Sequence, residues 1–196
     1  MQLNTNKIHY GKIDEVLFSF KDLEKLINFK PSTTTKNFKA TFFDNPSEEL
    51  SFNWPIPVWS SDKDSWPIKE IKKFINSSAC HYKDCSRVNK KINLFCKKLE
   101  EIYNKPVDCH IYFSLNKKLE SFKYHNDDYM TFIIVQEGTL KVTVDNNTKI
   151  LKEKEFVFIP KNINHKVESL SEKRLSLSFV LYEGDGKFEE RDWITI

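Results

Sequence analysis

Two histidines and one aspartate are spaced so that their side chains could bind one metal ion. His125 and Asp127 are separated by one residue within the stretch 122–144, and residues i and i+2 of a β-strand point to the same face. His165 lies in a second stretch, 155–166, and its imidazole could come from a neighbouring strand. Together the three would form the 2-His-1-carboxylate facial triad that binds Fe(II) in non-haem oxygenases. We therefore predict a metal site here; the alternative is a metal-free protein in which the spacing arose by chance.

The residues around this site alternate between apolar and polar from residue 107 onward. A period of two predicts short antiparallel strands, and turn residues separate them at Glu137-Gly138 and Asp145-Asn146-Asn147. We expect strands over residues 107–114, 121–124, 130–136, 140–144, 156–159, 165–169 and 174–182.

The predicted helices lie before these strands. Apolar side chains recur at helical spacing from residue 88 to residue 103, and Pro106 follows, which predicts a helix over 88–103. We also expect a helix from Ser65 through Ile75, a short helix over 22–28 and a strand-like segment over 13–20. An extended segment is expected over 38–43, and an edge strand or ordered loop over 52–59.

Helices followed by a run of short strands imply an α+β domain whose β part closes on itself. A double-stranded β-helix, the jelly-roll architecture that includes cupins, fits this order, with the N-terminal strands and two helices packed outside the core. A chain of 196 residues can bury one sizeable core. We expect one domain over 1–196, with N-terminal elements in 1–105, the metal-binding core in 106–182 and a tail in 183–196.

The composition excludes few functions. The formal net charge is +3, from 31 basic and 28 acidic residues, which does not argue for a nucleic-acid partner. The sequence shows no signal-peptide pattern and no apolar run of transmembrane length, so we expect a cytoplasmic protein with reduced thiols and no membrane partner. Cys80-His81 with Cys85 would make only half a zinc site. His9, His81 and His110 are interpreted as ordinary histidines.

Two groups of residues resemble the sequence motifs of the cupins. His125, Asp127, Thr131 and Gly138 resemble the first cupin motif, with Asp in place of its second His and Thr in place of its Glu. The second motif is matched by Lys154-Glu155, Pro160, Asn162 and His165, where glycine usually stands at positions 154 and 162. The pair His125-x-Asp127 resembles the HxD motif of the 2-oxoglutarate-dependent oxygenases among the cupins. The order of the predicted elements over residues 85–182 is similar to that in the JmjC-type hydroxylases, which include the ribosomal oxygenases.

The resemblance implies that 2-oxoglutarate binds the metal at one end and a cation at the other. JmjC proteins usually place a Lys or Arg two residues after the turn glycine, but that position is Leu140 here, and Lys141 would point away from the cavity. Other 2-oxoglutarate oxygenases use an Arg-x-Ser pair after the second His, which Arg174 and Ser176 match. The alternative for Arg174 is a surface turn.

Two further residues are implied to line the site. Thr131 shares the strand parity of His125 and Asp127 and could hydrogen-bond the metal-bound end of 2-oxoglutarate; the alternative is an ordinary strand former. Tyr112 would line the substrate side; the alternative is a buried core aromatic.

The resemblance implies an Fe(II)- and 2-oxoglutarate-dependent dioxygenase that consumes O2, with His125, Asp127 and His165 as its catalytic metal ligands. The expected reaction is hydroxylation of a peptide or protein side chain or of a small metabolite. Two alternatives stay open: a metal-dependent cupin enzyme (an isomerase, lyase or dioxygenase) that does not use 2-oxoglutarate, and a non-catalytic cupin-like binding protein. A homodimer is common in such folds, and the sequence does not decide it.

Overall fold

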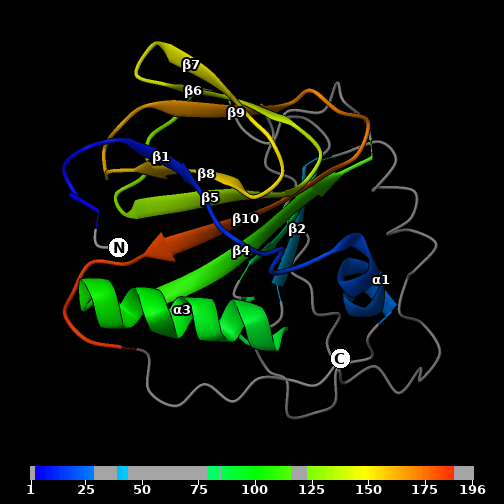
Figure 1. Cartoon of the computed structure of the whole chain (residues 1–196), viewed down its shortest axis with the longest axis horizontal. Coiled ribbons are helices and arrows are strands. Elements are labelled where there is room, and N and C mark those ends of the chain that lie inside the picture. The colour runs from blue at the N-terminus through cyan, green and yellow to red at the C-terminus, as the bar shows by residue number, and fades with distance from the viewer. Residues whose placement is uncertain (1–2, 29–38, 44–78, 84, 116–122, 188–196) are drawn as a thin grey trace.

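The computed structural model describes residues 3–28, 39–43, 79–83, 85–115 and 123–187, whose strands form two antiparallel sheets (Figure 1). The larger sheet has the order β1 (His9–Lys12), β8 (Glu155–Ile159), β5 (Met130–Glu137), β10 (Arg174–Leu181), β4 (Val107–Ser114), β3 (Ala79–Lys83) and β2 (Lys39–Phe43). The smaller sheet has the order β7 (Asn147–Leu151), β6 (Leu140–Val144) and β9 (His165–Ser169). The described helices are α1 (Phe20–Asn28) and α3 (Lys90–Tyr103).

The chain passes back and forth between the sheets as a jelly roll requires. β5, β8 and β10 lie in the larger sheet, whereas β6, β7 and β9 lie in the smaller one. β10 pairs with both β4 and β5, so strands distant in the sequence become neighbours. The predicted double-stranded β-helix is therefore confirmed. The strands predicted over 107–114, 130–136, 140–144, 156–159, 165–169 and 174–182 each match an observed strand to within one residue at either end.

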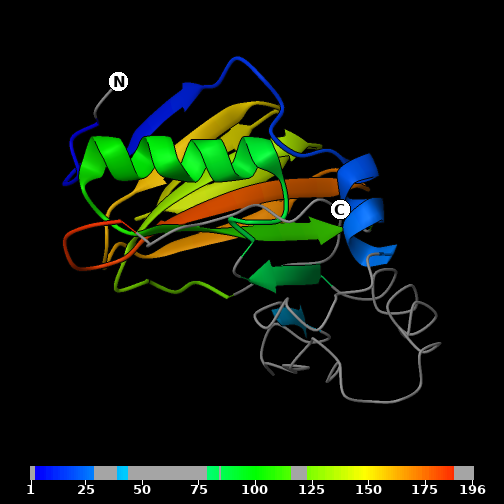
Figure 2. The same ribbon diagram turned by 90° about the horizontal axis from the view of Figure 1, so that it is seen from below.

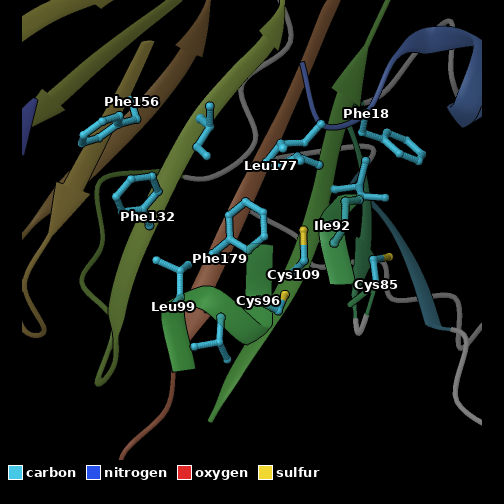
Figure 3. Close-up of a cluster of buried hydrophobic side chains, with 14 of the residues drawn as sticks. Phe18, Cys85, Ile92, Cys96, Leu99, Cys109, Phe132, Phe156, Leu177 and Phe179 are labelled. Carbon is cyan, nitrogen blue, oxygen red and sulfur yellow. The ribbon is translucent and has the colours of Figure 1, made fainter. Parts of the chain in front are cut away.

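The larger sheet has a different environment on each face. Helix α3 covers the face turned away from the smaller sheet (Figure 2). Because side chains alternate along a strand, Leu175, Leu177 and Phe179 of β10 pack on this helix-covered face. Figure 3 shows part of the same cluster, including Ile92, Cys96, Leu99, Leu177 and Phe179. The alternate residues of β10, among them Arg174 and Ser176, instead line a cavity.

The helix predicted over 88–103 is confirmed as α3, with both of its ends capped. The side chain of Asn89 accepts hydrogen bonds from the backbone amides of Lys91 and Ile92, which satisfies donors that have no partner within the helix. Asn104 follows the helix with a φ of 49° and donates its amide to Glu100 O. The short helix predicted over 22–28 is also present and begins two residues earlier, as α1. No helix in the described ranges is long and apolar enough to cross a membrane.

The strand predicted over 13–20 is wrong. The backbone amides of Leu17 and Phe18 donate to the side-chain oxygen of Gln136, at 2.7 and 3.1 Å, instead of joining a strand ladder. Ser19 then caps the start of α1, because it exchanges hydrogen bonds with Asp22 in the first turn of the helix. The edge strand of this region is β1, which pairs with β8.

The turn after β6 is shorter than predicted, and strand β7 was not foreseen. Asp145 and Asn146 have φ values of 47° and 68°, as a two-residue hairpin turn requires. Asn147 is already the first residue of β7 and pairs with Val144. The turn after β5 needs a glycine at 138, because φ there is 90° and a Cβ atom would collide with the carbonyl of Lys173.

The remaining expectations concern residues before 79 and residues 121–124, of which the structure describes only a part. Strand β3 was not predicted, whereas the extended segment over 38–43 is confirmed in its backbone as β2. Residues 123 and 124 are not in a strand, and the rest of the predicted strand 121–124 lies outside the described residues. The helix expected from Ser65 and the edge strand or ordered loop expected over 52–59 also lie outside them.

Candidate metal centre

Backbone hydrogen bonds bring the predicted metal ligands together. His125 forms an isolated antiparallel bridge with His165, the first residue of β9. The amide of His125 donates to the carbonyl of His165 at 3.0 Å, and the amide of His165 donates back at 2.7 Å. Residues 40 positions apart in the sequence (165 − 125) therefore lie side by side at the end of the smaller sheet.

The three side chains converge as a metal site requires. One ligand atom from each of His125, Asp127 and His165 lies within 4.8 Å of the other two. Oδ1 of Asp127 lies 3.9 Å from Nε2 of His125, and Oδ2 of Asp127 lies 3.6 Å from Nε2 of His165. Two imidazole nitrogens and one carboxylate on the same side of an ion form the facial arrangement expected for non-haem Fe(II). No other such cluster occurs among the residues that the structure describes.

The tautomers of both histidines suit metal binding. Nδ1 of His125 lies 2.8 Å from the carbonyl oxygen of Lys123, and Nδ1 of His165 lies 3.1 Å from that of Ile163. A carbonyl oxygen can only accept, so each Nδ1 carries the proton and donates it. Nε2 of each ring is then left with its lone pair facing Asp127. Backbone carbonyls commonly orient metal-binding histidines in this way, so the donor set fits a divalent transition metal.

The loop before His165 also holds Asp127 in position. The amide of Asn162 donates to the carbonyl of Asp127 at 2.7 Å, and the side chains of Asn126 and Asn164 are hydrogen-bonded at 3.1 Å. Asn162 has a φ of 61°, and Lys154, at the other position where cupins usually have glycine, has a φ of 68°. The backbone turns of the second motif are thus kept without their glycines.

The three ligands differ in their exposure. The side chain of His165 is only 5% exposed, compared with 32% for His125 and 20% for Asp127. Burial lowers the pKa of His165, and the nearby His125 lowers it further, whereas the hydrogen bond with Ile163 and the charge of Asp127 act in the opposite direction. His165 is therefore neutral at physiological pH, the protonation state in which imidazole binds metals.

A cavity of about 240 Å³ opens beside the three ligands. It lies at the β3, β4 and β10 side of the space between the sheets, and its walls mix polar and aromatic groups. The lining residues outside the ligand trio include Tyr112, Thr131, Arg174 and Ser176, the four residues that the resemblance implicated, together with His81, His110, Tyr129, Ile133, Val167, Ser178 and Val180.

Arg174 is a buried cation in the wall of this cavity. The residue is 2% exposed, its Nε and Nη2 each lie 3.4 Å from Oγ of Ser176, and its guanidinium carbon lies 5.7 Å from the ring centre of Tyr112. Burial lowers the pKa of Arg174 to about 10, which still leaves it charged at neutral pH. Arg174 is thus not on a surface turn. A charge that has been removed from water in this way favours an anionic ligand.

Thr131 and Tyr112 complete the wall around Arg174. Thr131 is 4% exposed, and its hydroxyl has no hydrogen-bond partner among the described residues. A buried hydroxyl without a partner is costly, so it is available to a ligand in the cavity. Burial raises the pKa of the Tyr112 hydroxyl, which therefore stays protonated and can donate. Lys141, the other candidate cation, pairs with Glu168 at 3.0 Å and does not line the cavity.

The sequence interpretation missed part of the cavity wall. His81 and His110, which were interpreted as ordinary, both line the cavity. His110 could have been found, because it shares strand parity with Tyr112 in β4. His81 could not, because it lies on β3, a strand that no periodicity in the neighbouring residues indicates. His81 faces the cavity whereas Cys85 is buried in the helix-covered cluster, so these two residues do not form the half zinc site that the sequence analysis had set aside. Tyr129 was not considered, although it stands two residues after Asp127.

The comparisons with known proteins agree with this fold. The family model of the cupin domain matches residues 112–182. No curated protein sequence matches the chain. The Escherichia coli ribosomal oxygenase YcfD, solved with cobalt and succinic acid, is similar with a TM-score of 0.63 and 14% identity over 91% of this chain and 49% of that chain.

Other structures of the same Escherichia coli protein give similar values. The complex with cobalt and 2-oxoglutarate has a TM-score of 0.60 and 14% identity, over 91% of this chain and 49% of that one. Another crystal structure has a TM-score of 0.62 and 13% identity, over 92% of this chain and 51% of that one. The chain thus spans about half the length of the structures it matches. The resemblance to cupin-fold oxygenases is confirmed at the level of the fold: the chain has a cupin fold, and the cupin family model matches the part of it over residues 112–182.

Proposed function

We propose that the protein is an Fe(II)- and 2-oxoglutarate-dependent oxygenase, and specifically a hydroxylase. The observation that carries the proposal is the presence of two complementary groups in one cavity. A facial set of two imidazoles and a carboxylate lies at the cavity, and the buried guanidinium of Arg174 lines the same cavity. A metal with open coordination positions and a separate cation are what a 2-oxo dicarboxylate needs at its two ends.

The metal ligands have clear individual roles. His125 and His165 would bind iron through Nε2, because each Nδ1 donates to a backbone carbonyl. Asp127 would supply the negative ligand, and its backbone carbonyl is fixed by the amide of Asn162. When bound, Fe(II) supplies the O2-dependent oxidation that is coupled to conversion of 2-oxoglutarate to succinate and CO2.

The remaining polar groups would orient the cosubstrate. Arg174 would bind the distal carboxylate, because an ionic hydrogen bond in a buried site is stronger than one in water. Ser176 holds the guanidinium from one side. Thr131 would donate its hydroxyl to an oxygen at the metal-bound end, which would satisfy a buried group that otherwise lacks a partner.

The structural comparisons support this assignment without fixing it. Structures of YcfD hold cobalt together with 2-oxoglutarate or with succinic acid. The present chain shares their fold and also has the ligand trio, so the same class of cosubstrate is the simplest proposal for it. The proposed substrate of the oxygenase is a peptide or protein side chain or a small metabolite.

The first test is an anaerobic titration of the metal-free protein with Fe(II) and then with 2-oxoglutarate. A visible metal-to-ligand charge-transfer band is expected from wild type. It should be lost in His125→Ala and Asp127→Ala, because each substitution removes one of the three side chains that would bind the metal directly. Arg174→Ala should shift the titration to higher 2-oxoglutarate concentrations.

Two control variants make the test specific. His9→Ala removes a histidine that does not line the cavity, and Lys141→Ala removes the cation that pairs with Glu168 on the outside. Both should behave like wild type. Iron binding without the band would favour a cupin enzyme that does not use 2-oxoglutarate. A wild-type protein that binds no Fe(II) would contradict the enzyme assignment altogether.

A further inference from the structure

The cavity has a second polar wall that neither the metal ligands nor Arg174 use. His81 of β3 lies opposite Tyr112 of β4 in the strand register. Their rings are stacked, with centroids 4.1 Å apart and planes at 12°. His110 precedes Tyr112 by two residues, and its ring lies 5.1 Å from that of His81 at an angle of 54°. Ser178 of β10 is paired with His110 and lines the cavity beside it.

This polar wall, defined as His81, His110 and Ser178, is built into the sheet. The exposed fractions are 2% for His81, 7% for His110 and 6% for Ser178. The opposite face of β4 is apolar, with Cys109, Ile111 and Phe113 in the helix-covered cluster. Two buried imidazoles that line a cavity are suited to a ligand that forms hydrogen bonds.

The charges around the polar wall restrict what that ligand can be. Among the described residues that line the cavity, Asp127 is the only carboxylate, and in the proposed function its charge is committed to the metal. Asp108, two residues before His110, accepts hydrogen bonds at one oxygen from the amides of Ser86 and Cys109 and does not line the cavity. Within the described part of the cavity wall a cationic group would therefore find no uncommitted counter-charge, and the metal and Arg174 would repel it.

We propose that the polar wall recognises a planar acceptor group of the substrate, a carboxylate or a carboxamide, so that the enzyme acts on acidic or amide-bearing molecules and excludes cationic ones. Imidazole N–H groups and the hydroxyl of Ser178 donate to the oxygen of such a group. The stacking on Tyr112 holds the imidazole of His81 in place. This inference rests on the proposed function, because the metal is what removes Asp127 as a partner for a cation.

The test measures the binding of three probes of similar size. These are the N-acetyl methylamides of glutamate, glutamine and lysine, and their dissociation constants are measured by saturation-transfer NMR. The protein is loaded with 2-oxoglutarate and with Zn(II) as a redox-inert substitute for Fe(II), so that the cosubstrate blocks Arg174. The glutamate or the glutamine probe should bind at least about tenfold more tightly than the lysine probe, because a buried cation without a counter-charge is strongly disfavoured.

Variants then locate the binding site. His81→Phe and His110→Phe keep a flat ring but remove its hydrogen-bonding nitrogens, and each should weaken binding of the preferred probe by about tenfold. His110→Gln keeps an N–H donor and should bind within about threefold of wild type, which separates loss of the hydrogen bond from loss of the fold. His9→Phe, outside the cavity, should have no effect.

Three results would overturn the inference: a lysine probe that binds as tightly as the others, Phe variants that bind like wild type, or no measurable binding of the glutamate and glutamine probes. Failure of the proposed function would look different. In that case the charge-transfer band would be absent from the wild-type titration, whereas probe binding to the metal-free protein would still depend on His81 and His110.

Discussion

The space between the two sheets has an apolar half and a polar half. The apolar half lies between β8, β5 and the smaller sheet, and its buried members are Ile133, Val135, Leu140, Val142, Val144, Leu151, Val157, Ile159 and Val167. The polar half lies beside β3, β4 and β10 and contains the cavity with the candidate metal ligands and Arg174. Ile133 and Val167 belong to both, which places the boundary at these residues.

In this jelly roll the residues that stabilise the fold and the residues of the candidate site lie in different halves of the space between the sheets. The inward positions of β8 are Val157 and Ile159, whereas those of β10 include Arg174, Ser176 and Ser178. Both strands have the same backbone pattern and belong to the same sheet. The apolar half holds the sheets together through burial, so the polar half can keep an open space and a buried charge. Substitutions in the two halves should therefore have different effects.

The largest effect on stability is expected from Leu140→Ala in the apolar half. Leu140 is fully buried, and truncation of such a side chain typically lowers the free energy of unfolding by about 2–5 kcal/mol. The affinity for Fe(II) and 2-oxoglutarate should not change at temperatures where the variant is folded. Denaturant unfolding and the anaerobic titration measure the two quantities. Loss of the charge-transfer band in a folded Leu140→Ala protein would show that the two halves are not independent.

The converse substitution is Arg174→Met in the polar half. It should weaken 2-oxoglutarate binding by about 10- to 100-fold, because an ionic hydrogen bond contributes roughly 1.5–3 kcal/mol. The free energy of unfolding should change by less than about 1 kcal/mol or increase, since replacing a buried charge by an apolar side chain of similar length is often neutral or stabilising. A loss of stability as large as that of Leu140→Ala would mean that Arg174 also has a structural role.

A pH-dependent effect should distinguish the polar half from the apolar half. Burial lowers the pKa of His165 in the folded protein below its ordinary value near 6.5. The unfolded chain then binds the proton more readily, so the metal-free protein should lose stability as pH falls through about 6.5 toward the lowered value. Urea unfolding of metal-free wild type and His165→Asn over this pH range measures the effect. Equal slopes for the two proteins would show that His165 does not contribute.

A small effect is expected at Lys154, in the turn before β8. Its φ of 68° is unfavourable for any residue with a Cβ atom. Lys154→Gly should relieve this strain by about 1 kcal/mol, partly offset by the greater freedom of glycine in the unfolded chain. Lys154→Val, which is β-branched, should instead lower stability by about 1 kcal/mol or more. Thermal unfolding of the pair measures the difference, and the same order should not be found at Lys152, which is exposed and has no positive φ.

The sequence predicted the strands of the jelly roll because a period of two is a local property. The same periodicity, combined with the motif resemblance, identified His125, Asp127 and His165, which the structure brings together. Non-local pairing was not predictable. The amides of Leu17 and Phe18 find their acceptor on Gln136, more than a hundred residues away, and His81 reaches the cavity only because β3 pairs with β4. Neither contact has a signature in the neighbouring residues.

The bridge between residues 125 and 165 also bears on how such a site can change over generations. The bonds that hold these positions together are formed by main-chain amides and carbonyls: His125 and His165 exchange two of them, and Asn162 reaches the carbonyl of Asp127 by a third. Main-chain groups remain when a side chain is replaced. These backbone hydrogen bonds therefore persist whichever side chains stand at positions 125, 127 and 165. A descendant could acquire a new set of metal ligands, or lose the metal, by single substitutions that leave the fold unchanged.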